Sequence, residues 1–145
     1  MRGLILDFGG VLAGPGSDAD RLSLVIADAR LRGVRTAILS NDPGGPHAQW
    51  LRDLGDGRVV DLVVLSGDLG VAKPDPRIYL KTAELLGVDP GDCVFVDDLP
   101  GNVRGAVEIG MVGIHHIEGS VTADEISLLL DLDGDEMQGG QESTW

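Results

Sequence analysis

Five short apolar runs, alternating with stretches of helical periodicity, constrain the fold of this chain more than any other property of its sequence. The runs are continuously apolar and do not alternate between apolar and polar residues, which is typical of strands buried on both faces of a parallel sheet. Helices between successive strands would cover those two faces. The pattern therefore predicts a three-layer α/β fold, with strands over residues 3–8, 34–40, 59–65, 93–96 and 112–115.

Short local signals predict where the helices begin and end. Ser17 with Asp20, and Thr122 with Glu125, have the spacing of a capping box, which indicates a helix start. Prolines suit the first turns of other helices, because the first amide groups of a helix have no partner within it. The expected helices cover residues 17–32, 46–54, 77–86, 100–110 and about 122–130, and residues 66–76 are expected to form a loop.

The length and charge of the chain limit its class. At 145 residues it is long enough for one domain with its own core, expected over residues 1–130, and residues 131–145 form an acidic stretch that we expect to be disordered. The net charge of −13 argues against nonspecific binding to nucleic acid or to an anionic membrane. A single cysteine, Cys93, excludes an internal disulfide and fits a reducing compartment. With no membrane-spanning run and no signal peptide, a cytoplasmic location is expected.

Polar side chains follow four of the predicted strands, and a parallel sheet would bring them to one edge. Taken singly, Ser40 with Asn41 suits a turn, and Lys73 suits the surface. Asp97 with Asp98 suits a helix N-terminus, where acids are favoured. Their joint placement favours a site, because clustered carboxylates repel one another unless a cation neutralises them, and oxygen ligands favour Mg²⁺. The residues at these strand ends are Asp7, Ser40, Asn41, Asp42, Lys73, Asp97, Asp98 and Asn102.

Two other residue types invite a functional interpretation that we do not adopt. His115 and His116 are adjacent at the end of the fifth predicted strand. One of two neighbours on a strand usually points into the core, so we expect a structural role for this pair. Cys93 is expected to be a small buried hydrophobic side chain.

Four motifs stand at these strand ends in a fixed order: DFGGV at 7–11, ILSN at 38–41, AKPDPRIY at 72–79 and VFVDDLPGN at 94–102. With them the chain resembles the haloacid dehalogenase superfamily of aspartate-nucleophile phosphohydrolases over nearly its whole length before the acidic stretch. The resemblance is closest to a branch that includes sugar-phosphate phosphatases and the phosphatase half of soluble epoxide hydrolases. It implies a Rossmann-like core with five parallel strands in the order 5-4-1-2-3.

The resemblance also implies a Mg²⁺-dependent phosphatase in which Asp7 attacks phosphorus and becomes an aspartyl-phosphate. Lys73 would neutralise Asp7 and the charge that develops on the phosphoryl group. The implied Mg²⁺ ligands are Asp7, the Gly9 carbonyl, Asp98 and Asp97. Asn102 would contact these ligands without binding the metal itself. The implied contacts to phosphoryl oxygens come from Ser40, the Asn41 main chain and Gly10.

Position 9 departs from the common family pattern, because Gly9 stands where phosphatases of this family commonly carry an aspartate. That aspartate acts as the acid for the leaving group and the base for the attacking water. Such acid–base catalysis contributes about 10²- to 10⁴-fold. The branch resembled here often has glycine too, and Asp42 is a candidate substitute because it is near along the chain.

The second departure is the length between the first two motifs. Only residues 12–37 separate them, and the predicted helix and strand use most of these, so no cap domain is expected. An open site suggests a large phosphorylated substrate, a partner that supplies the lid, or weak and broad activity. A homo-oligomer is a further expectation. A catalytically weak or inactive phosphate- and metal-binding domain is the alternative function. A haloacid dehalogenase is less favoured, since the family places its substrate-orienting residues largely in the cap.

Overall fold

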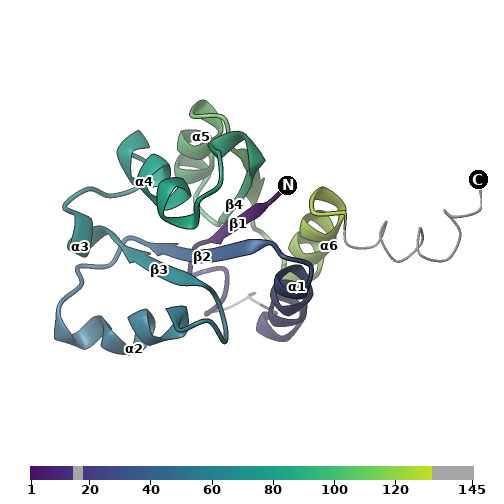
Figure 1. The fold of residues 1–145 in the computed structure, drawn as a ribbon, viewed down its shortest axis with the longest axis horizontal. Coiled ribbons are helices and arrows are strands. Elements are labelled where there is room, and N and C mark those ends of the chain that lie inside the picture. The colour runs from purple at the N-terminus through teal and green to yellow at the C-terminus, as the bar shows by residue number, and fades with distance from the viewer. Residues whose placement is uncertain (15–17, 132–145) are drawn as a thin grey trace, which may run out of the picture.

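The computed structural model describes residues 1–14 and 18–131. Within these residues, five strands form one sheet in the order β3-β2-β1-β4-β5, and every neighbouring pair is parallel (Figure 1). This is the predicted order, read from the opposite edge. The strands are β1 (Gly3–Leu6), β2 (Arg35–Ser40), β3 (Leu62–Leu65), β4 (Cys93–Asp97) and β5 (Val112–His115).

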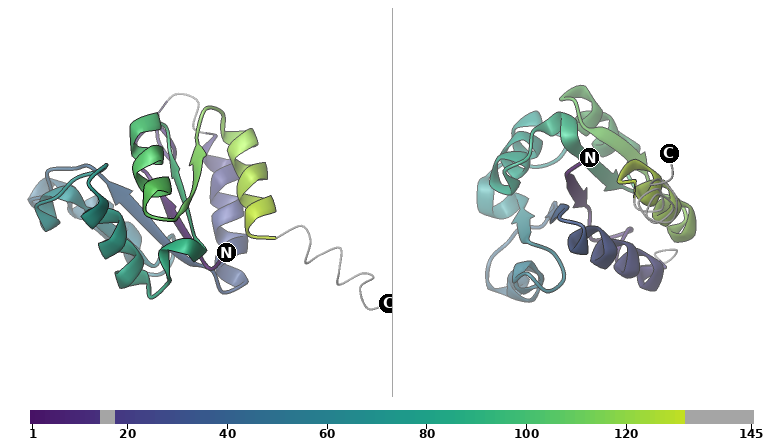
Figure 2. Two further views of the ribbon diagram at one scale, coloured as in Figure 1. Left: turned by 90° about the horizontal axis from the view of Figure 1, so that it is seen from above. Right: turned by 45° about the vertical axis from the view of Figure 1, so that its right-hand side comes forward.

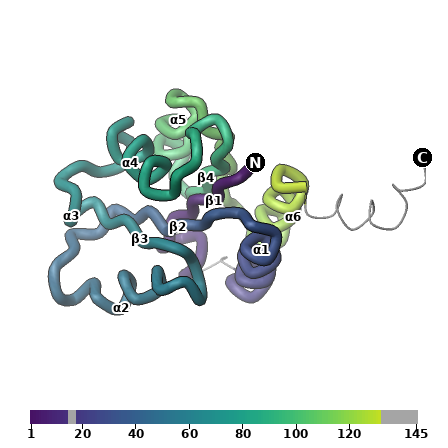
Figure 3. Tube along the Cα trace, viewed as in Figure 1, coloured from purple at the N-terminus to yellow at the C-terminus, as the bar shows by residue number. Residues whose placement is uncertain are grey.

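Helices cover both faces of the sheet, as Figure 2 shows from above. On one face, α1 and α6 lie side by side, and the tube in Figure 3 shows their pairing clearly. The other face is covered by α4 and α5. The longer helices are α1 (Ala19–Leu31), α4 (Pro76–Leu86), α5 (Pro100–Glu108) and α6 (Gly119–Leu129), and the short ones are α2 (Gln49–Arg52) and α3 (Ser66–Leu69).

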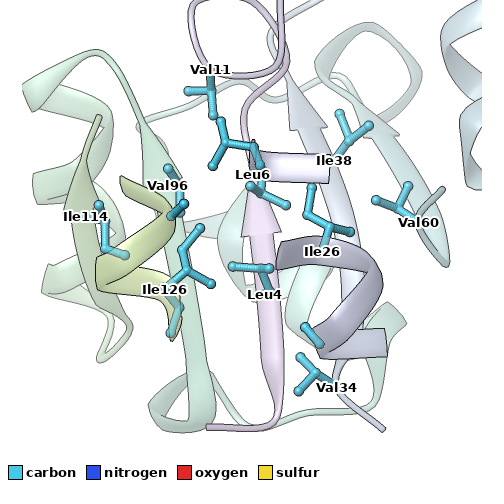
Figure 4. Close-up of a cluster of buried hydrophobic side chains, with 14 of the residues drawn as sticks. Leu4, Leu6, Val11, Ile26, Val34, Ile38, Val60, Val96, Ile114 and Ile126 are labelled. Atoms are coloured by element: carbon cyan, nitrogen blue, oxygen red, sulfur yellow. The ribbon is translucent and has the colours of Figure 1, made fainter. Parts of the chain in front are cut away.

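Two hydrophobic clusters separate the three layers, and β1 contributes to both because successive side chains of a strand point to opposite faces. Leu4 and Leu6 pack with Ile26 of α1 and Ile126 of α6 (Figure 4). Ile5, between them in sequence, belongs to the opposite cluster, which contains Ile78 and Tyr79 of α4 and Phe95 of β4. The predicted three-layer α/β fold is therefore confirmed.

The connections between strands contain no cap domain in the described part of the chain. A loop and α1 link β1 to β2, and α3, α4 and a 3₁₀ turn (Pro90–Asp92) link β3 to β4. The carboxyl edge of the sheet is therefore left uncovered, as the spacing of the first two motifs predicted. None of the described helices combines the length and the apolar character needed to cross a membrane.

The predicted helix start at Thr122 is wrong. Helix α6 begins at Gly119, and Thr122 is buried within it. The Thr122 hydroxyl oxygen lies 2.7 Å from Nδ1 of His116, which is also buried, while His115 is exposed. The expectation that one histidine of the pair points into the core is thus confirmed. Cys93 is likewise buried, as expected.

Other local predictions differ from the structure in detail. The segment over 66–76 contains the short helix α3, and the helix expected over 46–54 is broken into α2 between two 3₁₀ turns. Strand β3 begins at Leu62, because residues 57–60 form a turn closed by a hydrogen bond from the Gly57 amide to the Val60 carbonyl. The capping residue expected at Ser17 and the acidic stretch over 132–145 lie outside the described residues.

Candidate active site

Residues that follow β1 and β4 or lie at the end of β2, together with Lys73 from the loop between α3 and α4, meet around one cavity of about 300 Å³ at the carboxyl edge of the sheet. Nearly all are residues that the sequence singled out. Leu99 is the addition: its side chain is 56% exposed, and nothing in the sequence distinguishes such a leucine from an ordinary loop residue. The lining residues are Asp7, Gly9, Ser40, Asn41, Lys73, Asp98, Leu99 and Asn102.

Lys73 is buried at the base of this cavity, with 5% of the residue exposed, so its interpretation as a surface lysine is wrong. Its Nζ donates to Asp7 Oδ1 at 3.0 Å and to Asp97 Oδ2 at 2.8 Å. A buried ammonium group needs such partners, because an unpaired charge away from water is strongly destabilising. Lys73 therefore links Asp7 to Asp97, the last residue of β4.

Asp97 is fully buried, and its carboxylate is held by protein groups. Besides Lys73, Oδ2 accepts a hydrogen bond from Asn102 Nδ2 at 3.1 Å, and Oδ1 accepts one from the Leu99 amide at 3.0 Å. Asp98, the next residue, lines the cavity. The two members of the acid pair are thus used differently: Asp97 fixes Lys73, and Asp98 faces the open space.

The carboxylates of Asp7, Asp97 and Asp98 each bring one oxygen within 4.8 Å of the others. Oxygen donors at this spacing suit a small hard cation, and the cavity has room for the water ligands that Mg²⁺ keeps. The three carboxylates of the predicted ligand set therefore lie close together, but only Asp7 and Asp98 line the cavity, with Gly9 also in its wall.

Gly10 shapes the loop after β1. Its φ of +84° is in the left-handed region, and a Cβ atom there would lie 2.3 Å from Asp98 Oδ2. Its amide donates to the Ala13 carbonyl at 2.8 Å. The structure thus gives Gly10 a part in bringing the loop close to Asp98, and its contact with a phosphoryl group stays a prediction.

Asp42 is not among the residues that line the cavity. Its Oδ1 accepts a hydrogen bond of 2.8 Å from the Gly44 amide, so the carboxylate closes the loop after β2. The carboxamide of Asn41 binds the main chain of Lys73, a contact that the sequence did not predict. No local signal could reveal it, since the two residues are 32 positions apart.

The electrostatic surroundings of Asp7 favour its protonated form. Burial is the largest influence, and with the nearby Asp97 carboxylate it raises the pKa of the Asp7 carboxyl to about 6, while Lys73 acts in the opposite direction. The Asp7 carboxyl group therefore takes up a proton at a higher pH, near its pKa of about 6, than an ordinary aspartate does.

Several known proteins are similar to this chain. A family described as haloacid dehalogenase-like hydrolase matches residues 8–110. An uncharacterized protein from Corynebacterium glutamicum is 46% identical, with a TM-score of 0.86 over 90% of this chain and 96% of that chain. A phosphatase from Mycobacterium tuberculosis is 40% identical over 89 residues, which are 59% of this chain and 40% of that protein.

A third similar protein is a HAD family enzyme from Bacteroides thetaiotaomicron, solved as an aspartate-to-alanine variant in complex with magnesium and inorganic phosphate. It is 25% identical, with a TM-score of 0.56 over 69% of this chain and 53% of that chain. The chain spans less than two thirds of the length of the curated phosphatase described above. The match over residues 8–110, together with the carboxylate–lysine site, shows that this chain belongs to the haloacid dehalogenase-like hydrolases.

Proposed function

We propose that this chain is a Mg²⁺-dependent phosphomonoester phosphatase that acts through an aspartyl-phosphate on Asp7. The observation that carries the proposal is the Asp7 carboxylate, which faces an open cavity beside Asp98 and lies 3.0 Å from the Lys73 ammonium group. The phosphatase relative, and the magnesium and phosphate bound by the Bacteroides thetaiotaomicron enzyme, support this chemistry.

In the first step, an oxygen of the Asp7 carboxylate forms a bond to phosphorus, and the bond between phosphorus and the leaving-group oxygen breaks. Because Gly9 carries no acid, the leaving oxygen takes its proton from water in the open cavity. In the second step, water attacks the phosphorus of the aspartyl-phosphate, which releases inorganic phosphate and restores Asp7. Each step is an in-line displacement, in which positioning and charge stabilisation dominate.

The remaining residues act on charge and orientation. Asp7, Asp98 and the Gly9 carbonyl would hold Mg²⁺, which supplies positive charge to the phosphoryl oxygens when it is bound. Lys73 stabilises the same oxygens and the Asp7 carboxylate. Ser40 and the Asn41 main chain bind phosphoryl oxygens from the end of β2. Since the described chain has no cap, a phosphate on a large substrate can reach Asp7.

The direct test is hydrolysis of p-nitrophenyl phosphate with Mg²⁺ and after removal of metal with EDTA. We expect turnover only with Mg²⁺, restored when Mg²⁺ is added back. Borohydride reduction of the acid-quenched enzyme, which replaces an acyl phosphate by an alcohol and releases phosphate, should convert Asp7 to homoserine. Turnover that is unaffected by EDTA, or reduction of a carboxyl group other than that of Asp7, would contradict the proposed mechanism.

The affinity for Mg²⁺ should fall as the pH is lowered. With the pKa of Asp7 raised to about 6, the carboxyl is increasingly protonated below that pH, and the proton must leave before the oxygen can bind a cation. We expect the association constant to drop about fivefold between pH 6 and pH 5 and to level off above pH 7. Isothermal titration calorimetry measures this directly, and an unchanged pH dependence in Asp7→Asn would exclude Asp7 as its source.

A second candidate function is a binding domain that keeps the phosphate and metal pocket without efficient turnover. The open position at Gly9, together with the placement of Asp42 away from the cavity lining, favours it. This alternative expects Mg²⁺-dependent binding of beryllofluoride, which resembles a phosphoryl group on an aspartate, with no hydrolysis of phosphomonoesters.

A further inference from the structure

The side chain of Asn41 makes a reciprocal pair of hydrogen bonds with the main chain of Lys73. Its Nδ2 donates to the Lys73 carbonyl at 3.0 Å, and its Oδ1 accepts from the Lys73 amide at 2.9 Å. A carboxamide has a donor and an acceptor side by side, so it can satisfy both main-chain groups of one residue at once. An aspartate in this position could accept from the amide but could not donate to the carbonyl.

This pair of bonds matters because of where Lys73 lies in the chain. Lys73 falls between α3 and α4, in a turn outside the regular elements, so neither a helix nor the sheet holds its main chain in place. Asn41 follows directly after β2, an inner strand of the parallel sheet that lies between β3 and β1. The carboxamide therefore joins the lysine loop to a rigid part of the fold.

The other end of the lysine is fixed by the same segment. Its Nζ donates to the Leu39 carbonyl at 2.8 Å, and the ammonium group lies 5.5 Å from the centre of the Phe95 ring. The end of β2 thus binds both the main chain and the tip of Lys73. A lysine has a flexible four-carbon stem, and fixing both ends removes much of its freedom before any substrate arrives.

We propose that the Asn41 carboxamide is a positioning group for Lys73, which holds the ammonium group at the distance from Asp7 that phosphoryl transfer requires. The inference rests on the proposed phosphatase function and assigns the Asn41 side chain a role separate from that of its main chain. It follows that Asn41 affects the reaction through Lys73. Removing the Asn41 carboxamide should therefore lower kcat, because Lys73 stabilises charge in the transition state, and should change KM much less.

The test is a double-mutant cycle with Asn41→Ala and Lys73→Met, in which the main-chain amide of residue 41 is kept. We expect Asn41→Ala to lower kcat about tenfold in the wild-type background and by less than about twofold in the Lys73→Met background. The second loss is small because Lys73→Met has no ammonium group for Asn41 to position. Gln49→Ala, which removes an exposed carboxamide on α2, is the matched control and should leave kcat unchanged. Equal losses in both backgrounds would overturn the proposal.

A measurement that does not depend on activity separates this inference from the proposed function. The Lys73 amide hydrogen should exchange slowly with solvent in the wild-type protein and at least about tenfold faster in Asn41→Ala, because Asn41 Oδ1 is its acceptor. Unchanged exchange at Lys73 overturns the positioning role, whatever the activity. Absence of Mg²⁺-dependent hydrolysis in the wild type overturns the phosphatase function, while the exchange experiment still decides whether Asn41 holds the lysine.

Discussion

Replacing Asp7 with asparagine is expected to lower kcat for phosphomonoester hydrolysis by at least about 10³-fold, because the carboxamide cannot attack phosphorus. Asparagine has nearly the same shape, and its carbonyl oxygen can still accept the hydrogen bond from Lys73 Nζ that Asp7 accepts at 3.0 Å. The fold should therefore survive. Steady-state hydrolysis of p-nitrophenyl phosphate at saturating Mg²⁺ measures the loss, and circular dichroism checks the fold.

The matched control is Asp20→Asn, which makes the same chemical change at an exposed position in the first turn of α1. It should keep wild-type kcat. If Asp7→Asn and the wild type hydrolyse the ester at equal rates, Asp7 is not the nucleophile, and the phosphatase mechanism proposed for this site is wrong.

A Gly9→Asp substitution is expected to raise kcat by about 10²-fold or more. The structure leaves space for the new side chain, because a Cβ atom built on Gly9 meets no other atom within 4 Å, and Gly9 is not among the glycines with positive φ. The residue also lines the cavity, so a carboxyl group there can reach the leaving oxygen and the attacking water. The substitution would supply the acid and base that the site lacks.

The choice of substrate and control makes this result specific. An alkyl phosphate such as glycerol phosphate has a poor leaving group. A general acid should therefore accelerate its hydrolysis more than that of p-nitrophenyl phosphate. Gly9→Asn has the same size as Gly9→Asp but cannot donate or accept the transferred proton, so it should show no gain. Equal rates for the two variants would mean that acid–base catalysis is not what limits this enzyme.

The sheet could be predicted because its signals are local and repeated. Each strand contains a short apolar run, and a sheet covered on both faces buries such runs, as Ile5 and its neighbours Leu4 and Leu6 show by packing into opposite clusters. The closeness of Asp7 and Asp98 follows from the same topology, since parallel strands bring their carboxyl ends to one edge. Lys73 comes after α3 and is held at this edge by its contacts with Leu39 and Asn41.

What the sequence did not predict depends on contacts between distant residues. The capping-box spacing at Thr122 is real, yet the hydroxyl is taken by His116, and α6 starts three residues earlier. Helix α3 forms where Gly67 packs so tightly on the loop after β2 that a Cβ atom would lie 1.8 Å from the Pro43 carbonyl oxygen. Neither contact leaves a trace in the residues next to it.

The way Lys73 is shared has a consequence for the order in which ligands bind. One ammonium group serves Asp7 and Asp97, and Asp98 adds a third carboxylate at the same place, so the cavity without a divalent cation carries excess negative charge. A phosphate dianion that approaches such a cavity is repelled, and the repulsion ends once Mg²⁺ occupies it. We therefore expect compulsory addition of Mg²⁺ before substrate, with an apparent KM that rises steeply as Mg²⁺ becomes scarce. In the described residues no lid covers this site, so the concentration of Mg²⁺ would then determine whether substrate can bind.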